Sequence, residues 1–138
     1  MTQTDLIAAA RSWIGVPFLH QGRSIHGVDC VGFIESMMRA CDALPPDYSA
    51  PTIYSRRPDG RLLLTVSRYC THAEGHEAGT LILIQWRKDT EPSHAAINTG
   101  PTIIHAYQRA RAVIENGYRG IWKRDTHSVW RLPNVMYE

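Results

Sequence analysis

Cys30 stands at a position where the backbone could activate a thiol. It follows Asp29, a residue type that commonly caps helix N-termini, and an apolar run begins directly behind it. The first amides of a helix have no partner within the helix, and they lie at the positive end of its dipole. Both effects favour the thiolate over the thiol, and the thiolate is the nucleophile. The sequence therefore predicts an activated cysteine at a helix start.

A nucleophilic cysteine needs a base, and the base needs a group that orients it. His94 and His105 are the two histidines that fall within predicted strands, on either side of a turn at residues 98–101. Antiparallel pairing about the middle of this turn would place the two histidines directly opposite each other. Directly opposed Cβ atoms lie about 4.5–5.5 Å apart. We therefore expect His94 to act as the base and His105 to orient it.

This set of three predicts a particular pH dependence. A thiolate–imidazole pair whose groups titrate near their usual values, about 8.5 and 6.5, gives a bell-shaped rate profile. A single cysteine or histidine is more often a structural core residue than a catalytic one. The combination of all three, in this order and register, favours catalysis.

The other cysteines and histidines indicate no further site. Three cysteines make an odd number, so no disulfide framework is expected, and Cys41 and Cys70 fall in apolar segments. His72 and His76 have a spacing compatible with metal binding but no good third ligand nearby, so we expect a surface loop and no metal. No cofactor is expected.

Length and composition limit the class of protein. A chain of 138 residues is long enough to bury a core, and we expect one domain over residues 1–138. The net charge of +2 gives no reason to expect nucleic acid as a partner. The N-terminus lacks a signal-peptide pattern, and no apolar run approaches the roughly 18–20 residues of a membrane span. These features predict cytosolic synthesis without a signal peptide and no membrane span.

Hydrophobic periodicity and turn residues predict helices first and an antiparallel meander afterwards, which is an α+β class. Thr4 is expected to cap the first helix, and residues 18–28 and 45–61 are expected to be loops, the second of which could cover one side of the site. The expected helices cover residues 5–14, 30–43, 62–70 and 118–125. The expected strands cover residues 80–86, 94–99, 102–107, 112–115 and 129–132.

Four segments together resemble the NlpC (p-sixty) superfamily of papain-like cysteine peptidases. They are Gly-Val-Pro-Phe at 15–18, Gly-Val-Asp-Cys-Val-Gly-Phe at 27–33, Ser-His-Ala-Ala-Ile at 93–97 and Ile-Ile-His-Ala at 103–106. The resemblance covers most of the chain and implies a papain-like fold, with N-terminal helices packed on the sheet. The segment at 20–23, the short length and the missing signal look most like the phage branch, whose members are tail-associated cell-wall peptidases.

The resemblance implies a role for each matching residue. Cys30 would attack an amide carbonyl, His94 would carry the thiol proton to the leaving amine, and His105 would fix the imidazole. The implied substrates are peptide stems of peptidoglycan, often cut between D-γ-glutamate and a diamino acid, and no cofactor or metal is needed. Other phage tail proteins would be partners, and the protein would be tail-associated in the virion or released by lysis.

The chain departs from the family pattern beside the cysteine. Phe18 stands where the family usually has a tyrosine that helps the oxyanion site, and Val31 replaces a common serine. His20 is a candidate substitute donor, alongside the backbone amide of Cys30. Arg23, in the loop before Cys30, could meet a substrate carboxylate bidentately. We list Phe18, His20, Arg23 and Asp29 as substrate or oxyanion candidates.

The departures leave two alternatives open. The chain could be a phage tail assembly subunit that kept the fold and has little or no activity. It could also be an acyltransferase or amidase that acts on a lipid or small-molecule amide, because a thiol and an imidazole serve acyl transfer generally.

Overall fold

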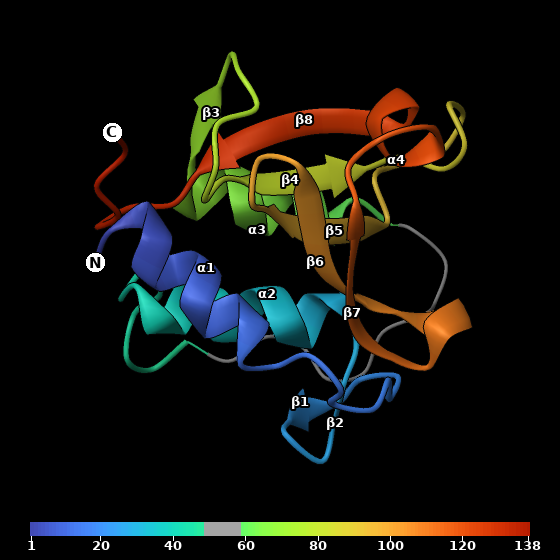
Figure 1. Cartoon of the computed structure of the whole chain (residues 1–138), viewed down its shortest axis with the longest axis horizontal. Helices are drawn as coiled ribbons and strands as arrows, with labels where there is room; N and C mark the ends of the chain where they lie inside the picture. The colour runs from blue at the N-terminus through green and yellow to red at the C-terminus, as the bar shows by residue number, and fades with distance from the viewer. Residues whose placement is uncertain (49–58) are drawn as a thin grey trace.

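The computed structural model describes residues 1–48 and 59–138. Among these residues, six strands form one antiparallel sheet in the order β3-β8-β4-β5-β6-β7, and α1 and α2 lie against it (Figure 1). The helices are α1 (Gln3–Arg11), α2 (Cys30–Ala40), α3 (Arg61–Tyr69) and α4 (Ile121–Arg124). The strands are β1 (Arg23–Ser24), β2 (Gly27–Val28), β3 (Thr71–Ala73), β4 (Leu81–Ile84), β5 (His94–Asn98), β6 (Thr102–Tyr107), β7 (Ala112–Gly117) and β8 (Thr126–Arg131), with a 3-10 turn η1 (Gln108–Ala110) between β6 and β7. The predicted α+β class, with helices on an antiparallel meander, is confirmed.

The first helix begins two residues earlier than the sequence suggested. Thr2, not Thr4, is its N-cap, because the Thr2 side chain accepts from the Asp5 amide while the Asp5 carboxylate accepts from the Thr2 amide. This reciprocal capping box satisfies two of the amides that a helix start otherwise leaves unpaired. The helix ends at Arg11 instead of continuing to residue 14.

The second helix starts where the sequence predicted and ends earlier. Asp29 is its N-cap, and the helix runs from Cys30 to Ala40 instead of to residue 43. Asp42 has a φ of 55°, a left-handed conformation that does not continue an α-helix. The buried face of α2 carries the apolar run of the sequence, so its packing against the sheet fixes the place of Cys30. The residues buried on this face are Gly32, Phe33, Ile34, Met37 and Met38.

Alternation along the strands sends side chains to two different faces of the sheet. Ala95 and Ile97 of β5 belong to the core under the helices, together with Leu81 and Leu83 of β4. Ala96 belongs to a second, smaller core on the other face, with Ile82 and Ile84 of β4 and Trp122 beside it. His94 and His105 alternate with the helix-facing residues, so the imidazoles lie on the face of Trp122. Cys30 therefore approaches the histidines at the end of the sheet, where β5 begins.

The β5–β6 hairpin has a register two residues different from the predicted one. Ile97 pairs with Ile104 and Asn98 with Ile103, so His94 and His105 are not directly opposed as predicted. The reason is a four-residue turn, in which the Thr99 amide donates to the Thr102 carbonyl at 2.9 Å. An offset of two keeps both side chains on the same face as diagonal neighbours, within reach of long or aromatic side chains.

Some short elements escaped the sequence analysis. Residues 18–28 were expected to be a loop, yet β1 and β2 pair there as a small antiparallel hairpin. Strand β3 pairs with β8 at the sheet edge in a region without a predicted strand. Strands of two or three residues are too short to show alternation. The predicted cover over the site at 45–61 falls largely at residues 49–58, outside the described residues.

Candidate active site

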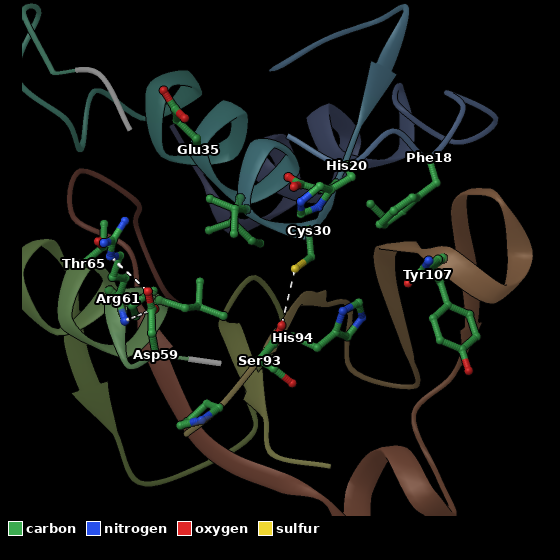
Figure 2. A pocket seen from close by; sticks show the side chains of 18 of the residues that line it. Phe18, His20, Cys30, Glu35, Asp59, Arg61, Thr65, Ser93, His94 and Tyr107 are labelled. Atoms are coloured by element: carbon green, nitrogen blue, oxygen red, sulfur yellow. Dashed lines mark hydrogen bonds and ion pairs between the residues drawn. The ribbon is translucent and has the colours of Figure 1, made fainter. Parts of the chain in front are cut away.

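A cavity of about 580 Å³ lies between α2, α3, η1 and the end of the sheet. Figure 2 shows Cys30 in its middle, with Phe18, His20 and Tyr107 on one side and Asp59, Arg61 and Thr65 on the other. The lining near Cys30 includes four further residues, which are Val31, Trp86, Ser93 and His94. A thiol and an imidazole thus share one accessible cavity.

The start of α2 is held by hydrogen bonds to a buried carboxylate. Asp29 is 4% exposed; its Oδ1 accepts from the Gly32 amide at 2.8 Å, and its Oδ2 accepts from the Gln21 amide at 2.8 Å. A Cβ on Gly32 would lie 2.2 Å from the carbonyl oxygen of Gly22. Only glycine therefore lets the loop before Cys30 pack this closely on the first helical turn. The Asp-Cys-x-Gly pattern has a geometric cause.

Arg23, a candidate for substrate binding, takes part in this support. Its guanidinium lies 3.3 Å from Asp29 Oδ1 and 3.0 Å from Glu35 Oε2. Glu35 also pairs with Arg39 at 3.0 Å, one turn further along α2. Arg23 is absent from the described lining of the cavity, whereas Asp29, His20 and Phe18 are part of it. These ion pairs indicate that Arg23 holds the β1–β2 hairpin against α2.

The sulfur of Cys30 points toward the Ser93–His94 segment (Figure 2), and the thiol donates to the Ser93 carbonyl oxygen at 3.6 Å. Burial raises the pKa of the Cys30 thiol to about 12, and the charge of Asp29 adds to this effect. Nearby backbone amides, among them that of Val31, counteract it only in part. The prediction of a thiolate favoured by the helix start was therefore wrong for the free protein, because desolvation outweighs the amides.

His94 and His105 form a buried hydrogen-bonded chain with Asn116. His94 Nε2 lies 2.7 Å from His105 Nδ1, and His105 Nε2 lies 2.6 Å from Asn116 Oδ1. Burial lowers the pKa of His94 well below its usual value, and His105 lowers it further. Burial also lowers the pKa of His105, against an opposing effect of its bond to Asn116. Both imidazoles are therefore neutral near pH 7.

Aromatic rings enclose the two imidazoles. Trp86 stacks on His94 with centroids 5.7 Å apart, and Trp122 meets His105 edge-on at 4.7 Å. Tyr107 lies 5.3 Å from His105 and 5.0 Å from Trp122. These rings pack around the imidazole pair, and a ring face also favours an imidazolium that forms there transiently. None of the three rings was predicted to be part of the site, because aromatic residues outside a motif carry no spacing signal.

Asn116 was also missed, although a signal existed. The sequence predicted the strand only to residue 115, whereas β7 extends to Gly117 and pairs Ile114 with His105. Asn116 is then the diagonal neighbour of His105 on the same face. A longer predicted strand would have placed this amide beside the imidazole.

The protonation states predict a broad pH profile for any reaction that uses His94 as a base. The base is lost only when His94 is protonated, which requires a pH below the ordinary value of about 6.5 because its pKa is lowered. The thiol titrates near 12. We expect kcat/KM to stay level between about pH 6.5 and 9, in place of the bell that the sequence predicted. A bell with limbs near 6.5 and 8.5 would contradict a neutral resting pair.

The described residues contain no cluster of three or more His, Cys, Asp or Glu side chains that could hold a metal ion. His76 instead contacts the Tyr118 hydroxyl at 3.1 Å, and His72 packs edge-on against Trp130. Over residues 1–48 and 59–138, every helix is too short or too polar to cross a bilayer.

Comparison with known proteins gives the family. A profile of the NlpC/P60 family matches residues 15–131 of this chain. The chain belongs to the NlpC/P60 family. No curated protein sequence gives a significant match.

Solved structures share the fold. An NlpC/P60 family protein from Bacillus cereus ATCC 10987 aligns with 96% of this chain at a TM-score of 0.72 and 20% identity. The NlpC/p60 domain of the peptidoglycan hydrolase SagA aligns with 96% at 0.61 and 18%. An NLP/P60 family protein from Staphylococcus aureus, described as similar to a lipoprotein, aligns with 94% at 0.66 and 18%.

This chain spans 40% of the Bacillus protein, 41% of the Staphylococcus protein and all of the SagA domain. The predicted family and papain-like α+β fold are confirmed. The single domain over residues 1–138 and the phage branch stay predictions, as do the roles of the individual site residues.

Proposed function

We propose that this protein is a cysteine peptidase that hydrolyses amide bonds in the peptide stems of peptidoglycan. The observation that carries the proposal is the buried chain of His94, His105 and Asn116 beside a cysteine that lines an open cavity. Family membership and the SagA domain, which belongs to a peptidoglycan hydrolase, support the choice of substrate.

Acylation uses the neutral pair as thiol and base. His94 accepts the proton of the Cys30 thiol as the sulfur attacks the amide carbonyl carbon, forming an S–C bond and a tetrahedral oxyanion. The oxyanion collapses, the C–N bond breaks, and the imidazolium of His94 gives its proton to the leaving amine. A thioester on Cys30 and a neutral His94 remain.

Deacylation reverses the proton path. Neutral His94 takes a proton from a water molecule, whose oxygen attacks the thioester carbonyl carbon. The second tetrahedral species collapses, the C–S bond breaks, and the proton returns from His94 to the sulfur. The products are a carboxylic acid and the regenerated thiol.

The first turn of α2 supplies the developing oxyanion with donors. The amides of Cys30 and Val31 belong to the group that has no acceptor within the helix. His20 lines the same cavity as Cys30 (Figure 2), and an imidazole N–H is a hydrogen-bond donor. Phe18 also lines the cavity but has no hydroxyl to contribute. We propose His20 and the helix amides as the oxyanion site.

The finer assignments rest on the resemblance of the sequence motifs to the family. We propose that the bond cut lies between D-γ-glutamate and a diamino acid. We also propose that the protein serves a phage or phage-like particle as a tail-associated enzyme, made in the cytosol and carried with the particle or released by lysis. Other tail proteins would then be its partners.

Arg109 is proposed to bind a stem carboxylate. It lies in η1 at the rim of the cavity, exposed, and no described residue forms an ion pair with it. Replacing Arg109 with glutamine should raise KM about tenfold while kcat changes little. A tenfold change in KM corresponds to the loss of one charge-assisted hydrogen bond to the substrate. Arg119→Gln, outside the lining, is the matched control. An equal effect of both variants on KM would contradict the assignment.

The experiment that tests the function is digestion of purified peptidoglycan fragments, with the products identified by mass spectrometry. We expect new stem peptides that each gain one water across a single type of bond. Absence of any product from well-folded protein would instead favour the tail assembly subunit. Release of an acyl group from a lipid amide, with peptidoglycan left intact, would favour the acyltransferase or amidase.

A further inference from the structure

We propose that Asn116 is a positioning residue that fixes the tautomers of both imidazoles and leaves His94 Nδ1 unprotonated as the base. The inference rests on the proposed function for its catalytic meaning, but the tautomers can be tested without any activity. Asn116 does not line the described cavity, so it acts only through His105.

The orientation of the Asn116 amide is set by its second contact. Its Nδ2 donates to the Gly117 carbonyl oxygen at 3.1 Å, which directs Oδ1 toward His105. An amide oxygen can only accept, so His105 Nε2 must carry the hydrogen at the 2.6 Å contact. If the amide were reversed, its two Nδ2 hydrogens would point at His105, and the hydrogen bond to the Gly117 carbonyl oxygen would be lost.

The hydrogen on His105 Nε2 decides the rest of the chain. Neutral His105 then has a bare Nδ1, which accepts from His94 Nε2 at 2.7 Å. Neutral His94 with its hydrogen on Nε2 has a bare Nδ1, the nitrogen a thiol proton needs. The acceptor oxygen of Asn116 thus determines, through the hydrogen bonds of both rings, that Nδ1 of His94 is unprotonated.

The surroundings of His105 offer no alternative acceptor for its Nε2 among the described residues. Its ring is fully buried, with Tyr107 and Trp122 packed against it and His94 on the remaining nitrogen. The nearest carboxylate in sequence, Glu115, is engaged by Arg11 at 3.0 Å and by Thr102 at 2.7 Å. Without the Asn116 oxygen, the buried Nε2–H of His105 would have no acceptor, which costs free energy. The tautomer of His105 with its hydrogen on Nδ1 avoids this cost.

The first test replaces Asn116 with leucine and reads the tautomers by ¹⁵N NMR of the imidazole nitrogens. In wild type we expect both rings with hydrogen on Nε2 near pH 7. In Asn116→Leu we expect a population with hydrogen on His105 Nδ1, and kcat lowered about 10–100-fold at unchanged KM, as for other residues that orient a histidine. Glu115→Gln, on the same strand, is the control and should change neither.

A second variant keeps the acceptor and adds a charge. Asn116→Asp should retain the wild-type tautomers and raise the pKa of the coupled imidazoles, which moves the acid limb of kcat/KM upward by about one pH unit. Unchanged ¹⁵N spectra in Asn116→Leu, or an unmoved acid limb in Asn116→Asp, would overturn the inference. If the wild-type protein hydrolyses no stem peptide, the proposed function is excluded, and the NMR result alone decides the role of Asn116.

Discussion

Replacing Cys30 with alanine is expected to lower kcat for stem-peptide hydrolysis by roughly 10⁴–10⁶-fold, to the level of the buffer blank. Cys30 supplies the only thiol in the described lining of the cavity, at the start of α2. Loss of a nucleophile costs about this much because no thioester can form, and the remaining donors only bind the substrate. The rate should be measured by chromatography of a defined muropeptide.

Cys70→Ala is the matched control for this loss. Cys70 is buried beside Val66 in the core under α3 and lies outside the lining of the cavity. We expect it to keep wild-type kcat with a modest loss of stability. Hydrolysis by Cys30→Ala within tenfold of wild type would exclude Cys30 as the nucleophile.

Replacing His94 with alanine should reduce kcat by about 10⁴-fold or more at near-neutral pH. The thiol has a pKa of about 12, so without a base nearly all of it stays protonated. The same substitution removes the proton donor for the leaving amine. The deficit should shrink as the pH approaches 11, because the thiolate fraction then rises independently of His94.

Added imidazole provides a second criterion for His94. The cavity left by the missing ring lies next to Cys30 and opens to solvent, so free imidazole should restore a measurable part of the rate. His127→Ala, at an exposed position on β8, is the control and should be indistinguishable from wild type. A His94→Ala deficit that is independent of both pH and imidazole would argue for a structural role.

Much of the fold could be predicted because its patterns are local. The second helix, the β6 strand and the order of helices before the meander follow from an N-cap, from alternation and from turn residues. The register of the β5–β6 hairpin could not be predicted, because it depends on whether Thr99 closes a four-residue turn. The N-cap at Thr2 was missed because both threonines are competent caps, and the Asp5 contact decides between them.

The candidate site was predictable in its members and less so in its electrostatics. The approach of Cys30 to the strand of His94, and the contact of His94 with His105, follow from residue types and spacing. Burial by residues distant in sequence and the charge of Asp29 raise the pKa of the Cys30 thiol. A prediction made from the helix start alone underestimates both effects. Arg23 was a candidate for substrate binding, and its ion pairs with Asp29 and Glu35 could not be read from the sequence.

Partition of the acyl-enzyme tests the account most directly. A defined muropeptide is digested at increasing concentrations of hydroxylamine, and the acyl product is identified by its mass in a mass spectrometer. A thioester on Cys30 predicts that the free acid is progressively replaced by the hydroxamate, and that Cys30→Ala yields neither. Wild-type hydrolysis that gives only the free acid at every hydroxylamine concentration would contradict a covalent intermediate, and with it the role given to Cys30.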